Sequence, residues 1–400
     1  MGKGGFVVLV NSTDRTWRLS SQDAYQIAIN FPPEIEFGTA GWTRSDVSFH
    51  VVYQLEGLDN FLRVEGRSYS GVQYQVTGFA DINSNFHDLG FNHDGYVTAL
   101  LVGDEAAGYV CNVADEAADW MSGSLGTIGE MKLRDICIPG SHDAGMSAPV
   151  NGSTVFGYAS SIITQRVPIA QQLTLGARYF DIRPVTHTGQ FYCGHCTGSQ
   201  GGNGQSIADV ISQYNKFNDS QYRSLFQQLQ TLNHLFQTGA TVDLNELTVN
   251  AFIKDSPAVV VVSSESHVPG DLIGSGFFNE TNYSIYDEYS EDDNAIEVMM
   301  ADQIGKMKSH PRVQAFLCLW TLTQSSWDWA VADSVLALAK QANGALGMVA
   351  PAVQVATSWP SILLIDSVSD TTAATLAISF NRLAASKRTS AMHHPRFMCM

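Results

Sequence analysis

The sequence predicts an α/β protein in which a (β/α) barrel follows a smaller, all-β, sandwich-like N-terminal domain. The chain has 400 residues, more than one typical domain needs, and 44% of them are apolar, as in globular proteins. Short strands fill the first part, whereas from Lys132 onward strongly apolar strands alternate with helical stretches. An acidic, alanine-rich segment, Asp104–Ala118, separates these two regions. We therefore divide the chain into residues 1–115 and 119–400.

The first region has the pattern of short β-strands separated by Gly, Asn and Asp. Residues 72–76, Val-Gln-Tyr-Gln-Val, alternate apolar and polar side chains, which is typical of a strand with one buried face. This pattern favours an antiparallel sandwich or barrel. No cluster of titratable residues in it resembles a catalytic site, so we expect a binding or packing module and leave its ligand open. The expected strands are Phe6–Val10, Tyr25–Phe31, Val47–Leu55, Phe61–Val64, Val72–Phe79 and Tyr96–Val102.

The second region has the pattern of a parallel sheet, because its strands are apolar on both faces and helical segments join them. A (β/α) barrel is the closed form of such a sheet, and its chemistry lies at the C-terminal ends of the strands. The expected strands are Asp135–Pro139, Tyr179–Ile182, Ala258–Ser263, Gln314–Leu322 and Ser361–Asp366, and the expected helical segments include Tyr222–Phe236 and Asp328–Lys340.

Charge and composition exclude several classes of partner. Lys and Arg number 22 against 39 Asp and Glu, and the net charge of -17 excludes nucleic acid as a partner, because binding a phosphate backbone requires positive surface. We find no apolar run of membrane-spanning length and no secretory signal, and the six cysteines are too sparse for a disulfide scaffold. We therefore expect a cytoplasmic protein or one peripheral to a membrane, and leave non-classical export and oligomeric state open.

The first chemical motif follows the first apolar strand of the second region. Residues 138–145 read Ile-Pro-Gly-Ser-His-Asp-Ala-Gly, which puts His142 and Asp143 on a turn at the expected barrel mouth. A titratable imidazole there is a candidate acid or base. A loop histidine that only caps the strand is an equally good interpretation of this segment alone.

The second motif ends the next strand, where residues 178–184 read Arg-Tyr-Phe-Asp-Ile-Arg-Pro. A spacing of two along a strand directs Asp181 and Arg183 to the same face, so the carboxylate can hold the guanidinium. A structural ion pair is the plain alternative. Beside a histidine, the arginine is a better candidate for binding a phosphoryl group, since its planar donors match phosphate oxygens.

The third motif, Cys193-Gly194-His195-Cys196, admits three interpretations. It is identical to the redox motif of protein disulfide isomerases, but the following Thr-Gly-Ser-Gln-Gly-Gly is a poor helix start, which disfavours thiol chemistry. A metal site would find at most three ligands here and no second pair at finger-like spacing. We consider His195 more important than its cysteines.

Taken in order, these three motifs resemble the X-domain of phosphatidylinositol-specific phospholipases C. The resemblance covers roughly residues 119–385, from Asp119-Trp120-Met121 to Leu363-Leu364-Ile365-Asp366, and leaves the N-terminal domain unexplained. It implies a TIM-like barrel and a phosphodiesterase that acts on phosphatidylinositol-type lipids at a membrane or micelle surface through peripheral contact. It also implies that His142 is the general base for the inositol 2-hydroxyl and His195 the general acid for the departing diacylglycerol oxygen.

The second motif indicates which branch of that family the chain resembles. Arg183 stands where metal-dependent members carry an acidic ligand, and Asp143 stands where they carry an asparagine, so the pattern matches the bacterial, metal-independent type. The resemblance implies no cofactor, with calcium disfavoured, because a fixed guanidinium supplies the positive charge. It further implies that Asp143 assists His195, Asp181 steadies Arg183 and Asp366 orients His142. Asp370 is the rival for this last role.

Two further residues are candidates for substrate binding, Glu265 and Trp320. Glu265 occupies a position similar to a calcium ligand of the eukaryotic-type strand, and we expect it to pair with Arg183. Trp320, like Trp327 and Trp359, could stack on a sugar or contact lipid, but a core role suits each equally well. The alternative functions are a catalytically silent lipid- or glycan-binding barrel and, less favoured, a thiol oxidoreductase.

Overall fold

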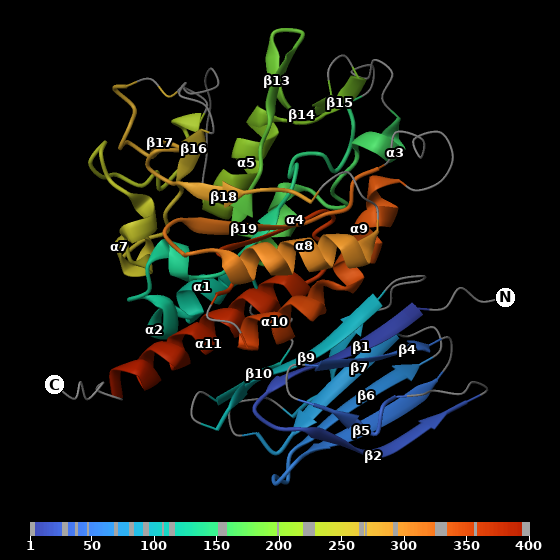
Figure 1. The fold of residues 1–400 in the computed structure, drawn as a ribbon. Coiled ribbons are helices and arrows are strands. Elements are labelled where there is room, and N and C mark those ends of the chain that lie inside the picture. Colours follow the sequence, from blue (N-terminus) through green and yellow to red (C-terminus); the bar gives the residue numbers. More distant parts are fainter. Residues whose placement is uncertain are drawn as a thin grey trace. The chain divides into compact units, whose positions relative to one another are not determined.

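The computed structural model of the chain (Figure 1) is a mixed α/β structure. Its contacts divide the chain into two compact units: residues 1–117, 340–357 and 375–400 form the first, and residues 118–339 and 358–374 form the second. The sequence analysis had placed 340–357 and 375–400 with the second region. The structure describes residues 5–25, 31–36, 39–45, 48–67, 71–79, 84–90, 96–105, 108–111, 117–150, 158–197, 200–218, 229–263, 268, 270–290, 295–324, 334–355 and 358–393.

The first unit contains two β-sheets. One has the order β10-β9-β1-β4, with β1 parallel to β9, and the other is antiparallel with the order β3-β2-β5-β6-β7-β8. The strands are β1 (Gly5–Thr13), β2 (Trp17–Ala24), β3 (Glu34–Ile35), β4 (Thr39–Ser45), β5 (Phe49–Leu55), β6 (Phe61–Arg67), β7 (Gly71–Thr77), β8 (His87–Gly90), β9 (Tyr96–Asp104) and β10 (Gly108–Cys111).

One hydrophobic core joins these two sheets. Val7 and Leu101 come from the first sheet, whereas Tyr53, Val64 and Tyr74 come from the second, and all are buried in one cluster. Burial alternates along β5, as expected for a strand with one face on the core. Five of the expected strands are present as β1, β5, β6, β7 and β9. The segment Tyr25–Phe31 has residues 26–30 outside the described part of the chain.

This unit also contains helical segments from the C-terminal part of the chain. They are the 3₁₀ turn Leu346–Met348, α10 (Val349–Val355), the end of α9 (Val335–Gly344) and most of α11 (Thr372–His393). The 3₁₀ turn packs closely on the first sheet, because a Cβ at Gly347 would lie 2.9 Å from Val10.

The second unit is built on a five-stranded parallel sheet with the order β12-β11-β20-β19-β18 (Figure 1). Its strands are β11 (Ile138–Ser141), β12 (Tyr179–Phe180), β18 (Ile285–Asp287), β19 (Ala315–Trp320) and β20 (Ile362–Ile365). All four residues of β20 are buried, which explains its unbroken apolar sequence. In this strand order β11, the first strand of the unit, pairs with β20, the last.

Two smaller sheets complete the strands of this unit. They are an antiparallel sheet of β13 (Pro184–His187), β14 (Gln190–Thr197) and β15 (Gln200–Ser206), and a parallel pair of β16 (Val261–Ser263) and β17 (Phe277–Asn279). The remaining helices are α1 (Trp120–Gly123), α2 (Leu125–Ile128), α3 (Ala159–Ile162), α4 (Ile169–Thr174), α5 (Ile207–Asn218), α7 (Val249–Ile253) and α8 (Ile296–Ser309), with 3₁₀ turns at Ala117–Asp119, Leu133–Asp135 and Leu244–Glu246.

All five strands expected in the second region contribute to its sheets, but the expected helical segments are only partly described. Of Tyr222–Phe236, residues 222–228 lie outside the described part, and the remainder is mostly turn. Of Asp328–Lys340, residues 328–333 lie outside it, and the remainder falls largely in α9. Within the described ranges, no helix is both long enough and apolar enough to cross a membrane.

Candidate active site

Three neighbouring strand ends bring together the first polar side chains of the site. Ser141 of β11 lies in register with Phe180 of β12 and with Ile365 of β20. The next residues along the three strands are His142, Asp181 and Asp366. Because parallel strands end at one edge of a sheet, these side chains gather at that edge. Backbone bonds extend the pairing by one step, from His142 N to Ile365 O (3.0 Å) and from Asp181 N to Ser141 O (3.0 Å).

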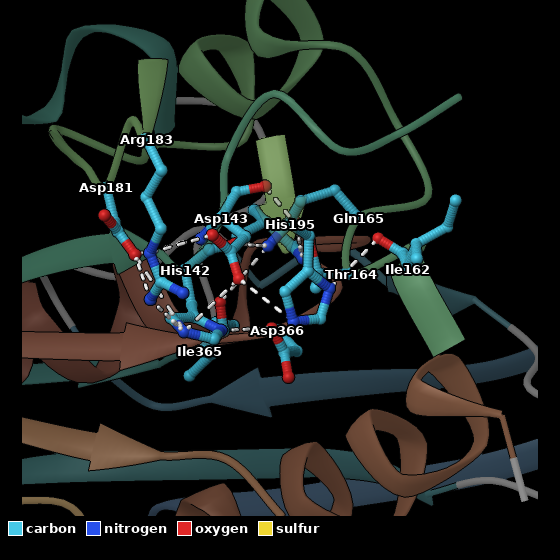
Figure 2. Close-up of polar contacts among 11 residues, drawn as sticks. His142, Asp143, Ile162, Thr164, Gln165, Asp181, Arg183, His195, Ile365 and Asp366 are labelled. Carbon is cyan, nitrogen blue, oxygen red and sulfur yellow. Dashed lines mark hydrogen bonds and ion pairs between the residues drawn. The ribbon is translucent and has the colours of Figure 1, made fainter. Parts of the chain in front are cut away.

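His142 lies between a carboxylate and a guanidinium (Figure 2). Its Nδ1 is 2.8 Å from Asp366 Oδ1, and its Nε2 is 2.8 Å from Arg183 Nη2. Burial by itself lowers the pKa of His142, but the carboxylates of Asp366, Asp143 and Asp181 outweigh burial and raise it to about 9. Arg183 can donate to Nε2 only when that nitrogen carries no proton. The observed contacts therefore describe the neutral imidazole, with Nδ1–H donated to Asp366.

Asp143 is the buried centre of the group. Its side chain is 0% exposed, and its backbone has a φ of 42°, an uncommon conformation for a residue with a Cβ. Its two oxygens pair with three groups: Oδ1 is 3.0 Å from Arg183 Nε, and Oδ2 is 3.6 Å from His142 Nε2 and 3.8 Å from His195 Nε2. Burial raises the pKa of the Asp143 carboxyl, and the three nearby basic groups offset only part of that rise.

Arg183 connects the second strand end to the other groups. Beyond its contacts with His142 and Asp143, its Nη2 lies 2.8 Å from Asp181 Oδ2. Burial lowers the pKa of Arg183, and Asp143 and Asp181 more than restore it, so the side chain keeps its charge. Its side chain is 49% exposed, which leaves part of the guanidinium open to a ligand.

His195 comes from a different structural element, the antiparallel strand β14. Backbone pairing with β13 brings it to the site, because Gly194 N donates to Arg183 O (2.8 Å). Its Nδ1 lies 3.3 Å from the carbonyl oxygen of Ile162, and its Nε2 faces Asp143. Since both histidines place Nε2 within 4 Å of Asp143 Oδ2, the two nitrogens are closer together than the sum of those distances, which is below 8 Å.

The cysteines beside His195 differ in exposure. Cys193 is buried against the backbone of Gly145, where a Cβ would lie 2.1 Å from its Sγ, while Cys196 is exposed. Burial raises the pKa of Cys193 to about 12. This thiol lies within a strand rather than at a helix N-terminus and is not activated toward a thiolate. The contacts of Cys193 are those of a packing residue.

Within the described residues, one group of side chains has the spacing of a cation site. Ligand atoms of His142, Asp143 and Asp181 all lie within 4.8 Å of one another. Calcium takes six to eight oxygen ligands, whereas this group offers one nitrogen and two carboxylates, both already paired with Arg183. A divalent ion would also face the charge of that guanidinium. The group therefore fits calcium poorly.

The structure adds Asp287, which the sequence analysis missed, to the groups facing the site. It is the last residue of the short strand β18 and is exposed. Burial of its carboxyl and the charge of Asp181 raise its pKa, while His142 and Arg183 lower it, so it lies within electrostatic reach of all three. A depression of about 460 Å³ borders it and is lined by Asp287, Glu288, Tyr289, Asp302 and Lys306.

The remaining sequence candidates lie elsewhere. Trp320 is fully buried in β19, and Trp359 is mostly buried against Arg312, whose guanidinium carbon is 3.9 Å from the ring centre. Asp370 accepts from Thr372 N (2.9 Å) at the start of α11 rather than contacting His142. Glu265 and Trp327 lie outside the described residues, and a substrate contact of Glu265 or Trp320 stays a prediction.

The fold and the site together define an α/β protein that carries two imidazoles and one guanidinium around a buried carboxylate at the end of a parallel sheet. No family model matches the chain. A PI-PLC X domain-containing protein of Dictyostelium discoideum is 36% identical over 92 residues, a match that covers 20% of this chain and 16% of that protein. The resemblance to phosphatidylinositol-specific phospholipase C X-domains that the motifs predict is borne out by this relative over the 92 matched residues.

Two solved structures resemble the chain at low identity. The phosphatidylinositol-specific phospholipase C of Listeria monocytogenes is 17% identical with a TM-score of 0.46, over 68% of this chain and 99% of that one. A mutant of the corresponding enzyme of Staphylococcus aureus is 15% identical with a TM-score of 0.47, over 66% of this chain and 98% of that one.

Proposed function

We propose that the chain is a phosphodiesterase that cleaves phosphatidylinositol-type lipids without a metal ion and gives a cyclic inositol phosphate and diacylglycerol. One observation carries the proposal: His142, His195 and Arg183 all contact the single buried carboxylate of Asp143. Two imidazoles less than 8 Å apart can flank one phosphorus, and the guanidinium beside His142 can neutralise its oxygens.

The first proton transfer belongs to His142. With Nδ1–H held by Asp366 at 2.8 Å, the lone pair of Nε2 faces the site and can accept the proton of the inositol 2-hydroxyl. The hydroxyl oxygen then attacks phosphorus and forms the new P–O bond of the cyclic phosphate. In the free protein Arg183 donates to that same lone pair, so substrate binding must draw the guanidinium onto the phosphate.

The second proton transfer belongs to His195. As the P–O bond to diacylglycerol breaks, the departing oxygen needs a proton, and protonated His195 can donate one from Nε2. The Ile162 carbonyl lies at Nδ1 and the Asp143 carboxylate lies near Nε2, so each ring nitrogen faces an acceptor oxygen. One proton enters His142 as another leaves His195, so the step consumes no water.

Arg183 supplies the positive charge that a metal would otherwise provide. It is held at Nε by Asp143 and at Nη2 by Asp181, which fixes its plane while half of the side chain stays exposed. Asp287 stands at the rim as an acceptor for hydroxyl groups of a polyol head group. We also infer that the strands belong to a TIM-like barrel. The first strand of the unit, β11, pairs with the last, β20, as the closure of such a barrel requires.

The direct test is release of water-soluble cyclic inositol phosphate from phosphatidylinositol micelles, with and without EDTA. We expect activity that resists the chelator and falls by roughly 10²- to 10⁴-fold in His142→Ala. Complete inactivation by EDTA, with recovery on added calcium, would contradict the metal-free mechanism. Absence of turnover in a folded wild-type protein would instead favour the silent lipid- or glycan-binding barrel.

The thiol oxidoreductase is the weaker alternative. Its nucleophile would be Cys193, whose thiol is buried and whose pKa is raised to about 12. Insulin reduction that is lost in Cys193→Ser would support it. We expect no such activity.

A further inference from the structure

One short stretch, residues 162–165, runs from the last residue of α3 toward α4 and contacts each of the three segments that carry His142, His195 and Asp366 (Figure 2). Gln165 is fully buried and makes three contacts with its amide group. Its Nε2 donates to His142 O (2.7 Å) and to Ile365 O (3.4 Å), and its Oε1 accepts from Val368 N (2.9 Å). A single side chain thus links the backbone on both sides of the His142–Asp366 contact.

Thr164 makes a second link between the same two loops. Its hydroxyl donates to Asp143 O (3.0 Å), and its carbonyl accepts from Ser367 N (2.8 Å). Asp143 and Ser367 both have positive φ angles, 42° and 52°, although neither is glycine. Such backbone conformations are unfavourable for residues with a Cβ and persist only where the surroundings hold them. Thr164 bonds to both, so it holds both strained turns.

The same stretch also reaches the second histidine. The Ile162 carbonyl accepts from His195 Nδ1, which keeps a proton on that nitrogen and turns Nε2 toward Asp143. Ile162, Thr164 and Gln165 therefore set the rotation of both rings relative to their carboxylates.

We propose that Gln165, supported by Thr164, is a positioning residue for the two-histidine reaction: its buried amide fixes the distance between His142 and Asp366 by tying their loops together. This inference rests on the proposed function. Only a primary amide fits the role, because two carbonyls require donors and one N–H requires an acceptor. A glutamate would place lone pairs against the His142 carbonyl, and a methionine would fill the space without any of these bonds.

The test compares Gln165→Met with a variant that loses a buried amide at another site. Asn282 is also a buried amide with three backbone bonds, to Ala240 O, Val242 O and Asn279 N, and none of these residues contacts the histidines. We expect Gln165→Met and Asn282→Leu to lower the melting temperature by similar amounts. Only Gln165→Met should lower kcat, by about 10- to 100-fold with KM within about threefold, because small misplacements of reacting groups are costly.

A conservative pair tests the second link in the same assay. Thr164→Val keeps the side-chain shape and removes the hydroxyl, whereas Thr164→Ser restores it. We expect kcat to fall severalfold in the first variant and to recover in the second.

An activity-independent readout separates this inference from the proposed function. In protein labelled with ¹⁵N-histidine, the ring nitrogens of His142 report whether Nδ1 still donates to Asp366. If the wild type is inactive but Gln165→Met changes these signals and Asn282→Leu does not, the reaction is refuted and the positioning role stands. If Gln165→Met leaves both kcat and the ring signals as Asn282→Leu does, Gln165 is only a packing residue and the inference is overturned.

Discussion

Two buried polar groups, one in each unit, differ in how their buried polar atoms are paired. In the first unit Asn11 uses all of its side chain on local partners: Nδ2 donates to Arg15 O and Ile35 O, and Oδ1 accepts from Thr13 N and Thr13 Oγ1. Trp17 completes the group by donating to the Thr13 hydroxyl. Every one of these bonds joins two uncharged groups, since Arg15 and Ile35 take part through their backbone carbonyls, and this is how a buried polar cluster stabilises a fold.

Asp143 in the second unit is held by ion pairs instead of hydrogen bonds. Its carboxylate is fully buried, yet neither oxygen has a hydrogen bond. It is held only by ion pairs, at 3.0 to 3.8 Å, with Arg183, His142 and His195. Two of these three partners are imidazoles, which can accept and donate protons. A buried carboxylate whose partners are titratable suits a reaction in which protons move, and the difference between the two groups can be tested by variants in each.

The largest effect is expected from Arg183→Met. Losing this guanidinium removes the permanent positive charge that contacts His142, Asp143 and Asp181, and we expect kcat/KM to fall by about 10²- to 10³-fold in the micelle assay. Arg183→Lys should recover little, because an ammonium cannot reproduce the planar two-sided contact.

A matched arginine provides the control for that variant. Arg312 pairs with Asp135 at 3.1 Å and stacks on Trp359, residues that precede β11 and β20, whereas His142 and Asp366 follow these strands. Arg312→Met should lower the free energy of unfolding while leaving kcat/KM unchanged. Equal losses of activity in both variants would show that Arg183 has only a structural role.

A smaller and pH-dependent effect is expected from Asp366→Asn. Asp366 is the largest contributor raising the pKa of His142 to about 9, so in the wild type kcat/KM should rise with pH as His142 loses its proton. The variant should move this limb to lower pH and lower its plateau by roughly tenfold. Asp370→Asn, which removes only the α11 cap, should leave the profile in place.

The free energy of unfolding should also depend on the pair of His142 and Asp366. Because the folded pKa of His142 is raised above its usual 6.5, the pair stabilises the protein fully below that pH and loses this contribution as pH rises through about 9. Asp366→Asn should therefore destabilise the protein more at pH 6 than at pH 10, as urea unfolding can measure. An equal destabilisation at both values would contradict the raised pKa.

The part of the site that the sequence predicted is the part that strand pairing dictates. His142, Asp181 and Asp366 each follow an apolar strand, and parallel strands bring their ends together, so residue order alone places them at one edge. The position of Arg183 could be predicted because it lies two residues after Asp181, a spacing that directs both side chains to the same face of a strand. Their roles in turnover remain proposals, whereas their convergence is visible in the structure.

What the sequence could not predict depends on irregular backbone. Thr164 and Gln165 lie in a connection without periodicity, and they bind carbonyls and N–H groups, which every residue has and which leave no signal in the sequence. Asp287 ends a strand of three residues, too short for a pattern. The polar strand β2 was also missed, because only Trp17 of its eight residues is buried, Leu19 and Ala24 are half-buried, and the rest are exposed, so the strand has no regular alternation.

The smallest effect on activity is expected from the uncharged cluster of the first unit. Asn11→Ala removes the four side-chain hydrogen bonds of Asn11, which should cost about 1–3 kcal/mol of unfolding free energy. Because these bonds join only uncharged groups, the loss should be the same at pH 6 and pH 9, and kcat should not change below the unfolding transition. A pH-dependent loss, or a fall in kcat without unfolding, would mean that the first unit takes part in the reaction and would remove the distinction between the two groups.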